Sequence, residues 1–280
     1  MQNAKAGKSA GENWLGLCAL AMLVTMIQVT RASSSQQFPA DLSLAEAEAA
    51  AYPSLEPIVV FPDFTTTPDV DVKKQWFLDF LELYIDAENR RVAELRRELL
   101  EMADIASNNF RLSRTERRQM MAIAQTYAVE TEGRNDKQIL LELLMRVDTI
   151  PTSLALAQAA NESAWGTSRF ALEANNIFGQ WCYDEGCGLV PSRRASSATH
   201  EVRSFKSIEH AVQAYFMNLN THAEYQNFRE MRSHMRTQQG NLDPMVLAYG
   251  LVGYAERGEH YVDEVQTIIQ QNGLRIRDKI

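Results

Sequence analysis

One carboxylate in this sequence, that of Glu162, lies in a context in which it could act as a general acid. Glu162 belongs to the stretch 150–181, which opens with Pro151, a residue that suits the first turn of a helix because its missing N–H costs nothing there. Residues 154–160 are good helix formers and nearly apolar on every side, which predicts a buried helix ending near Glu162. Desolvation there should raise the pKa of Glu162, as a general acid working near neutral pH requires. A solvated charge at a helix end is the alternative.

The residues after Glu162 predict a break in the helical path of the chain. We expect Gly166 to adopt the left-handed conformation that stops a helix. A second short helix is expected over Thr167–Ala174, ended by Asn175 and Asn176, which tolerate positive φ. The carboxylate would then project from a rigid, apolar support.

The amino-acid sequence of this stretch resembles the signature of a known family. Residues 158–168 read QAANESAWGTS and residues 175–179 read NNIFG. They resemble the pattern A-x-x-E-S-G-W-G-x-S…N-N-L-F-G of the bacterial endo-β-N-acetylglucosaminidases, which include flagellar peptidoglycan hydrolases and autolysins, and above all their Bax-like branch in Gram-negative bacteria. The resemblance implies that Glu162 is the catalytic acid. It also implies a lysozyme-like fold with the substrate cleft between a helical body and a small β lobe. Ala164 stands where the family usually has Gly.

Glycoside cleavage needs a second group to support the developing oxocarbenium ion, either a carboxylate or the 2-acetamido group of the substrate itself. In the resembling family a second acid on the β lobe has been proposed for some members, and here the lobe offers Glu185 and Glu201. We favour Glu201 slightly as the second catalytic residue, because it should lie on the returning strand. A surface charge is the more common role for either residue.

A second match begins at Tyr254, where the chain reads YAERGEHY and the family has Y-A-T-D-x-x-Y. The resemblance places Tyr254 in the cleft near the catalytic acid, where a phenol could hydrogen-bond the acetamido group or the transition state. Tyr261 matches the second tyrosine one residue further on and is a substrate-binding candidate, with a core position as the alternative. Trp165, Phe178 and Asn176 are also substrate-binding candidates; packing of the two rings and capping by the amide are the alternatives.

Beyond the N-terminal Cys18, the chain has only Cys182 and Cys187, with four residues between them. In an oxidising compartment a small disulfide loop is the simplest interpretation, although so short a loop adds little stability. A metal site would need more ligands nearby. The histidines are scattered, so that neither a metal nor another cofactor is implied: His200, His210, His222, His234 and His260.

Composition narrows the class of protein. The 280 residues are 45% hydrophobic and 23% charged, which is ordinary for a globular protein with a sizeable core. Lys and Arg together number 28 against 36 Asp and Glu, giving a net charge of −8. This balance, without a basic patch, argues against nucleic acid as a partner.

The first 32 residues predict a signal peptide or a membrane anchor. Lys5 and Lys8 precede an apolar run over 14–29, and Ala32 could sit just before a cleavage point. The protein should therefore be exported, to the periplasm or to the periplasmic face of the inner membrane. Residues 33–70, rich in Pro, Ser and Thr, predict a flexible linker that could tether the rest of the chain.

The remaining sequence predicts a mostly helical α+β fold. Residues 71–147 should form a helical N-terminal region of three helices, whose first carries an aromatic stripe over 76–85 that we expect in the core. Capping-box spacings at Ser113 and Asn135 mark the next two starts. Residues 148–280 should form the glucosaminidase domain, with a small β-hairpin between Gly188 and Phe205 and further helices over 207–222, 223–239, from Asp243, and 259–271.

Three functions fit these patterns. The first is a monomeric peptidoglycan hydrolase that cleaves the β-1,4 bond between N-acetylglucosamine and N-acetylmuramic acid. The second is a catalytically silent module of the same fold that binds or organises the cell wall, which the lack of an obvious second carboxylate favours. The third is a lytic transglycosylase, whose chemistry also needs a single Glu.

Overall fold

The computed structural model describes residues 61–279 except 109, 193, 195–197 and 239. These residues belong to one compact unit. The predicted signal peptide or anchor (1–32) and most of the predicted linker lie outside the described residues. Within the described part, none of the helices combines the length and apolar character that crossing a bilayer requires.

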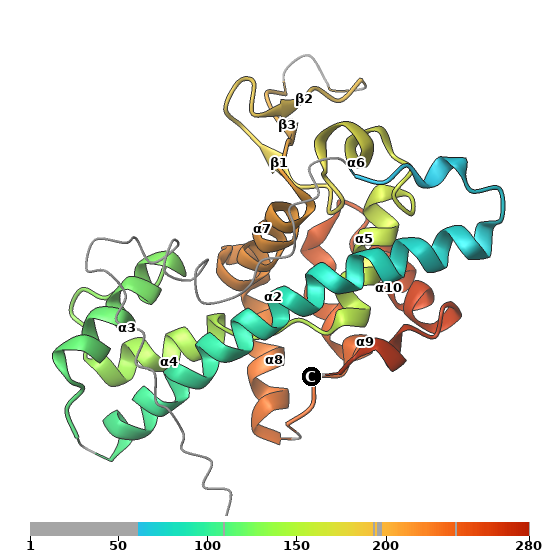
Figure 1. Ribbon diagram of the computed structural model, residues 1–280. Coiled ribbons are helices and arrows are strands. Elements are labelled where there is room, and N and C mark those ends of the chain that lie inside the picture. Colours follow the sequence, from blue (N-terminus) through green and yellow to red (C-terminus); the bar gives the residue numbers. More distant parts are fainter. Residues whose placement is uncertain (1–60, 109, 193, 195–197, 239, 280) are drawn as a thin grey trace, which may run out of the picture. The chain divides into compact units, whose positions relative to one another are not determined.

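The chain folds as a mostly helical α+β protein with one small antiparallel sheet, which confirms the predicted lysozyme-like class (Figure 1). The α-helices are α2 (Val70–Ser107), α3 (Arg114–Thr126), α4 (Asp136–Arg146), α5 (Thr152–Ser163), α6 (Arg169–Ala174), α7 (Ile208–Thr221), α8 (Gln226–Gln238), α9 (Pro244–Leu247) and α10 (Glu259–Gln271). Short 3-10 helices are η1 (Phe64–Thr66), η2 (Ala223–Tyr225), η3 (Ala248–Tyr254) and η4 (Leu274–Arg277). The strands are β1 (Trp181–Cys182), β2 (Gly188–Leu189) and β3 (Glu201–Arg203).

The long helix α2 packs against α4, α5 and α7 and shares one hydrophobic core with them (Figure 1). Its buried line includes Phe77, Leu81 and Ile85, as the helical spacing predicts. Trp76 is the exception to the predicted aromatic core: it is 58% exposed, because it lies on the solvent side of the same turn as Phe77.

The prediction of a flexible linker over 33–70 is wrong for its last residues, 61–69. Phe61 and Phe64 are buried, and Phe64 meets Phe77 of α2 edge to face with ring centroids 5.8 Å apart. Asp63 and Asp69 then cap η1 and α2 with their carboxylates. Residues 61–69 are therefore part of the folded body.

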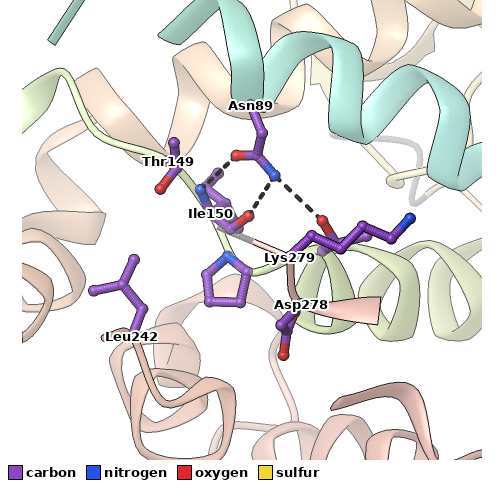
Figure 2. A pocket seen from close by; sticks show the side chains of 8 residues that line it. Asn89, Thr149, Ile150, Leu242, Asp278 and Lys279 are labelled. Atoms are coloured by element: carbon purple, nitrogen blue, oxygen red, sulfur yellow. Dashed lines mark hydrogen bonds between the residues drawn. The ribbon is translucent and has the colours of Figure 1, made fainter. Parts of the chain in front are cut away.

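Helix α5 lies at the centre of the core, in contact with α2 and α10. Every residue from Thr152 to Ala160 is buried, as the all-round apolar pattern predicts. The start of the helix is held by Asn89 of α2, whose side chain accepts a hydrogen bond from Ile150 N (2.9 Å) and donates one to Ile150 O (2.8 Å) (Figure 2). Asn89 thereby satisfies backbone groups that burial would otherwise leave without a partner.

The N-cap of α5, Pro151, makes no capping hydrogen bond of its own. The C-terminal tail supplies one instead: Asp278 accepts from Ser153 N at 2.8 Å and from Ser153 Oγ at 2.7 Å. The tail is in turn held on α2, where Arg277 and Lys279 both pair with Glu82. A carboxylate at a helix N-terminus also complements the helix dipole.

The β lobe differs in topology from the predicted hairpin. β2 and β3 are antiparallel neighbours, as predicted between Gly188 and Phe205, but β3 is the central strand and also pairs with β1. Trp181 lies opposite Val202 in this pairing. Strand β1 has two residues, too few to show alternation in the sequence.

A buried charge cluster joins α4 to α8. Asp148 is 1% exposed and receives hydrogen bonds from Arg236 at 2.9 and 3.2 Å, while Arg96 lies 3.5 Å away. Arg232, fully buried, donates to the backbone carbonyls of Asp148 and Thr149. Burial alone would raise the pKa of Asp148, but the neighbouring guanidinium charges and the bonds from Arg236 outweigh it and hold the pKa below its usual range.

We expect Asp148→Asn to lower the free energy of unfolding by about 3–5 kcal/mol, because it leaves buried arginines without their counter-charge. Since the pKa of Asp148 is depressed, its contribution is present above the pKa of the unfolded carboxyl and is lost as pH falls. Urea unfolding at neutral pH measures the loss. Asp136→Asn is the control: it breaks an exposed pair with Arg117 and should cost less than about 1 kcal/mol. Equal losses in both variants would contradict this prediction.

Candidate active site

Glu162 occupies the last turn of α5, one residue before its end at Ser163, and three consecutive residues in the left-handed region follow. Ala164 (φ 51°), Trp165 (φ 58°) and Gly166 (φ 76°) turn the chain sharply away from the helix axis. The helix therefore stops two residues earlier than the predicted stop at Gly166, because Ala164 is the C-cap. The second short helix, α6, begins at Arg169, and Asn175 ends it in the left-handed conformation as predicted.

Gly166 allows this turn to pack on the rest of the core. A Cβ at this position would come within 2.8 Å of Phe61 and 2.9 Å of Phe64 and Phe77. Trp165 packs edge to face on Phe77 with ring centroids 5.8 Å apart. This arrangement realises the packing alternative for Trp165, whose partners are on α2.

The carboxyl group of Glu162 lies in a largely apolar environment. The residue is half-buried, but its Oε1 atom is inaccessible to solvent and accepts no hydrogen bond from the described residues. Burial raises the pKa of Glu162 to about 7. A hydrogen bond with Tyr261 and the charge of Arg257 oppose this shift, and the charge of Glu264 adds to it. Glu162 is thus half-protonated near neutral pH, as a general acid requires.

The backbone of the NNIFG motif passes directly against this carboxyl. A Cβ at Gly179 would lie 2.8 Å from Glu162 Oε2, so only glycine fits without displacing the acid. One residue earlier, the carbonyl of Phe178 accepts a hydrogen bond of 2.7 Å from the hydroxyl of Tyr254. The motif therefore acts through its backbone, by bringing a close wall of the site to Glu162.

A layer of tyrosines surrounds the acid. Tyr254 and Tyr261 are stacked with centroids 5.3 Å apart, and the charge of Glu162 contributes to the raised pKa of each. The amide of Gln158, one turn before Glu162, donates to Tyr261 Oη (2.9 Å) and accepts from Tyr215 Oη (2.7 Å). Desolvation is the main cause of the raised tyrosine pKa values, so the hydroxyls stay protonated and can donate.

Tyr254 lies near enough to Glu162 to be influenced by its charge, as the resemblance implies, and so does Tyr261. Tyr261 is fully buried, which is the core alternative for this residue. Gln158, Tyr215 and Gly179 are parts of the site that the sequence analysis did not single out. An amide within an otherwise apolar, buried helix was the one available signal, since such a group must find partners.

Two residues predicted to bind substrate are instead buried and make contacts within the protein. Phe178 is buried and stacks on Tyr215 with centroids 3.9 Å apart, so neither of its faces is free for a sugar. Asn176 is also buried; its amide donates to the carbonyls of Gln180 and Arg203, each at 2.8 Å, and accepts from Gln180 N. It ties the chain before β1 to the end of β3, which is neither substrate binding nor a helix cap.

Both candidates for a second catalytic carboxylate lie on the β lobe. Glu201 is buried and its two oxygens accept from Gly186 N (3.1 Å) and Gly188 N (2.8 Å); these backbone bonds lower its pKa. Glu185 is exposed in the loop closed by the predicted Cys182–Cys187 disulfide, which is present. Glu201 thus serves to hold the disulfide loop on β3.

Comparison with known proteins identifies the family of the chain. Residues 137–274 match the Glucosaminidase family, described as mannosyl-glycoprotein endo-beta-N-acetylglucosaminidase. The chain therefore belongs to the glucosaminidase family, whose members are glycoside hydrolases related to peptidoglycan metabolism. Within it, the chain is a Bax-like member: it is 32% identical over 211 residues to Protein bax of Escherichia coli (strain K12), covering 75% of this chain and 74% of that protein. No solved structure matches the chain.

We expect Ala164→Gly to stabilise the protein, because Ala164 lies in the left-handed turn after Glu162. The left-handed conformation costs an L-residue roughly 1–2 kcal/mol, and the extra freedom of glycine in the unfolded chain returns roughly 0.5–1 kcal/mol of that. The exposed methyl group of Ala164 adds no packing. A net gain of about 0.5–1 kcal/mol should appear in urea unfolding. The control Ala122→Gly, inside α3, should lose about 1 kcal/mol; a loss at position 164 would show that its backbone is unstrained.

Proposed function

We propose that this protein is an endo-β-N-acetylglucosaminidase that hydrolyses the β-1,4 bond between N-acetylglucosamine and N-acetylmuramic acid in peptidoglycan, with Glu162 as the general acid. The observation that carries the proposal is the carboxyl of Glu162, whose pKa is raised to about 7 by burial at the end of α5. Membership of the glucosaminidase family supplies the substrate class.

In this mechanism the protonated Glu162 donates to the glycosidic oxygen as the bond to the anomeric carbon breaks. The leaving sugar departs neutral, and Glu162 becomes an anion at the moment when positive charge develops on the reacting ring. The hydroxyl of Tyr261 stabilises that anion through the hydrogen bond that already lowers the pKa of Glu162. After cleavage, Glu162 can take a proton from the attacking water.

We further propose that the 2-acetamido group of the reacting N-acetylglucosamine, rather than a second carboxylate, stabilises the oxocarbenium ion. Glu201 is unsuited to that role because both of its oxygens are engaged by backbone amides of the disulfide loop. Tyr254, held by its bond to the Phe178 carbonyl, would then line the reacting subsite.

Export remains part of the proposal. The apolar run over 14–29 would direct the chain out of the cytoplasm or hold it on the periplasmic face of the inner membrane, where peptidoglycan is accessible.

Digestion of purified peptidoglycan by the full-length chain tests the assignment. We expect products with reducing N-acetylglucosamine ends in mass spectrometry. Glu162→Gln keeps the shape of the side chain but removes the transferable proton, so its rate should fall about a hundredfold or more. The matched control is Glu185→Gln, an exposed change that should leave the rate unaltered. Full activity of Glu162→Gln would overturn the role of Glu162.

The same digestion separates the alternative functions. Anhydro-sugar ends on the muramic residue would identify a lytic transglycosylase. Retention of the chain on peptidoglycan without any new ends would identify a silent wall-binding module. Either result would contradict hydrolysis.

The pH dependence gives a second prediction. Because the active form of a general acid is protonated, kcat/KM should fall as pH rises through about 7, the pKa of Glu162. Arg257→Gln removes a charge that lowers this pKa and should move the fall to higher pH; Glu264→Gln removes a charge that raises it and should move the fall to lower pH. Shifts in the same direction, or no shift, would assign the fall to another group.

A further inference from the structure

The β lobe presents a flat aromatic surface that the proposed catalysis does not use. Trp181 of β1 is 50% exposed, and its ring is stacked on the imidazole of His200 with centroids 4.1 Å apart and planes 13° from parallel. In the antiparallel register Trp181 lies opposite Val202, so that His200 is its diagonal neighbour on the same face. One face of the indole is therefore covered, and the ring is held in one orientation.

The chain around this pair is fixed by bonds other than apolar packing. Cys182, directly after Trp181, is in the disulfide with Cys187, and Glu201, directly after His200, is bonded to the disulfide loop. The carbonyl of His200 accepts a hydrogen bond of 3.1 Å from Arg194. Of the strand residues of this lobe, Val202 is the one buried hydrophobic. Trp181 is thus held rigidly without contributing to a core.

The pair also lies close to the acid. A Cβ at Gly179 would lie 2.8 Å from Glu162 Oε2, and Trp181 follows two residues later, so the Cα atoms of Gly179 and Trp181 are at most about 7.6 Å apart. One glycan strand can therefore reach both the carboxyl and the indole. The flat, partly apolar face of a pyranose ring packs on an aromatic face much as another ring does, through C–H groups directed at its negative centre.

We propose that the Trp181–His200 pair is a glycan-binding subsite: the exposed face of Trp181 stacks on an N-acetylated sugar ring one or more units away from the bond that is cut. The proposal rests on the proposed function for its substrate class. It assigns to the pair a part in holding the strand and none in the chemical step. The covering imidazole keeps the indole in place, which reduces the entropy lost when a sugar binds.

The test measures binding without cleavage. In the Glu162→Gln background, the full-length chain is titrated with purified peptidoglycan sacculi, and the bound fraction is read by sedimentation. We expect Trp181→Ala to weaken binding about tenfold, the size of one good aromatic contact. Trp181→Phe should restore most of it. Trp76→Ala is the matched control, since Trp76 is similarly exposed (58%) but belongs to α2 and not to the β lobe; it should bind like the parent.

His200→Ala provides a second variant in case Trp181→Ala unfolds, as checked by circular dichroism. It should weaken binding measurably, by about threefold to fivefold, which is less than the effect expected for Trp181→Ala. Unchanged binding by both variants would overturn the subsite, as would an equal loss in Trp76→Ala. So would a loss of binding to phospholipid vesicles with sacculus binding intact, which would make the pair a membrane contact. If the chain with Glu162 intact does not cleave peptidoglycan yet Trp181→Ala still loses sacculus binding, the proposed hydrolysis fails and the subsite stands.

Discussion

The central constraint on this structure is that α5 is buried on all sides from Thr152 to Ala160, so a solvent-facing carboxyl can emerge only at its end. The same burial also removes water from the carboxyl of Glu162 at the end of the helix and raises its pKa to about 7. The rigid support of Glu162 and its raised pKa therefore have one physical origin. The left-handed run from Ala164 to Gly166 then turns the chain away, which leaves the carboxyl against Gly179 and the tyrosines.

Polar groups from distant parts of the chain keep this helix in register. Asn89 binds both backbone groups of Ile150 before the helix, and Gln158 connects its middle to Tyr261 and Tyr215. Each bond satisfies a buried group whose desolvation would otherwise be costly. Since apolar packing is not directional, these bonds are what define the rotation of α5 about its axis and hence the direction in which Glu162 points.

Features determined by neighbouring residues could be predicted from the sequence, and features determined by long-range contacts could not. The capping boxes at Ser113 and Asn135 and the helix start at Asp243 are present, because each depends on residues within one turn. The buried helix before Glu162 follows from its composition. In contrast, the engagement of Glu201 by loop amides depends on the fold of the lobe, and the burial of Phe178 depends on Tyr215, which comes 37 residues later in the sequence. Trp76 and Phe77 are adjacent aromatics, and only packing decides which one faces solvent.

The cap that Asp278 places on α5 has a consequence for how the chain folds. Ser153 and Asp278 are 125 residues apart, so the first turn of the central helix gains its carboxylate only after all of the matched glucosaminidase region, 137–274, has been synthesised. Contacts between such distant residues carry a large loop-closure cost and form slowly. The helix that bears the acid should thus become fully ordered late during synthesis, when the emerging tail docks on α2 and closes the domain.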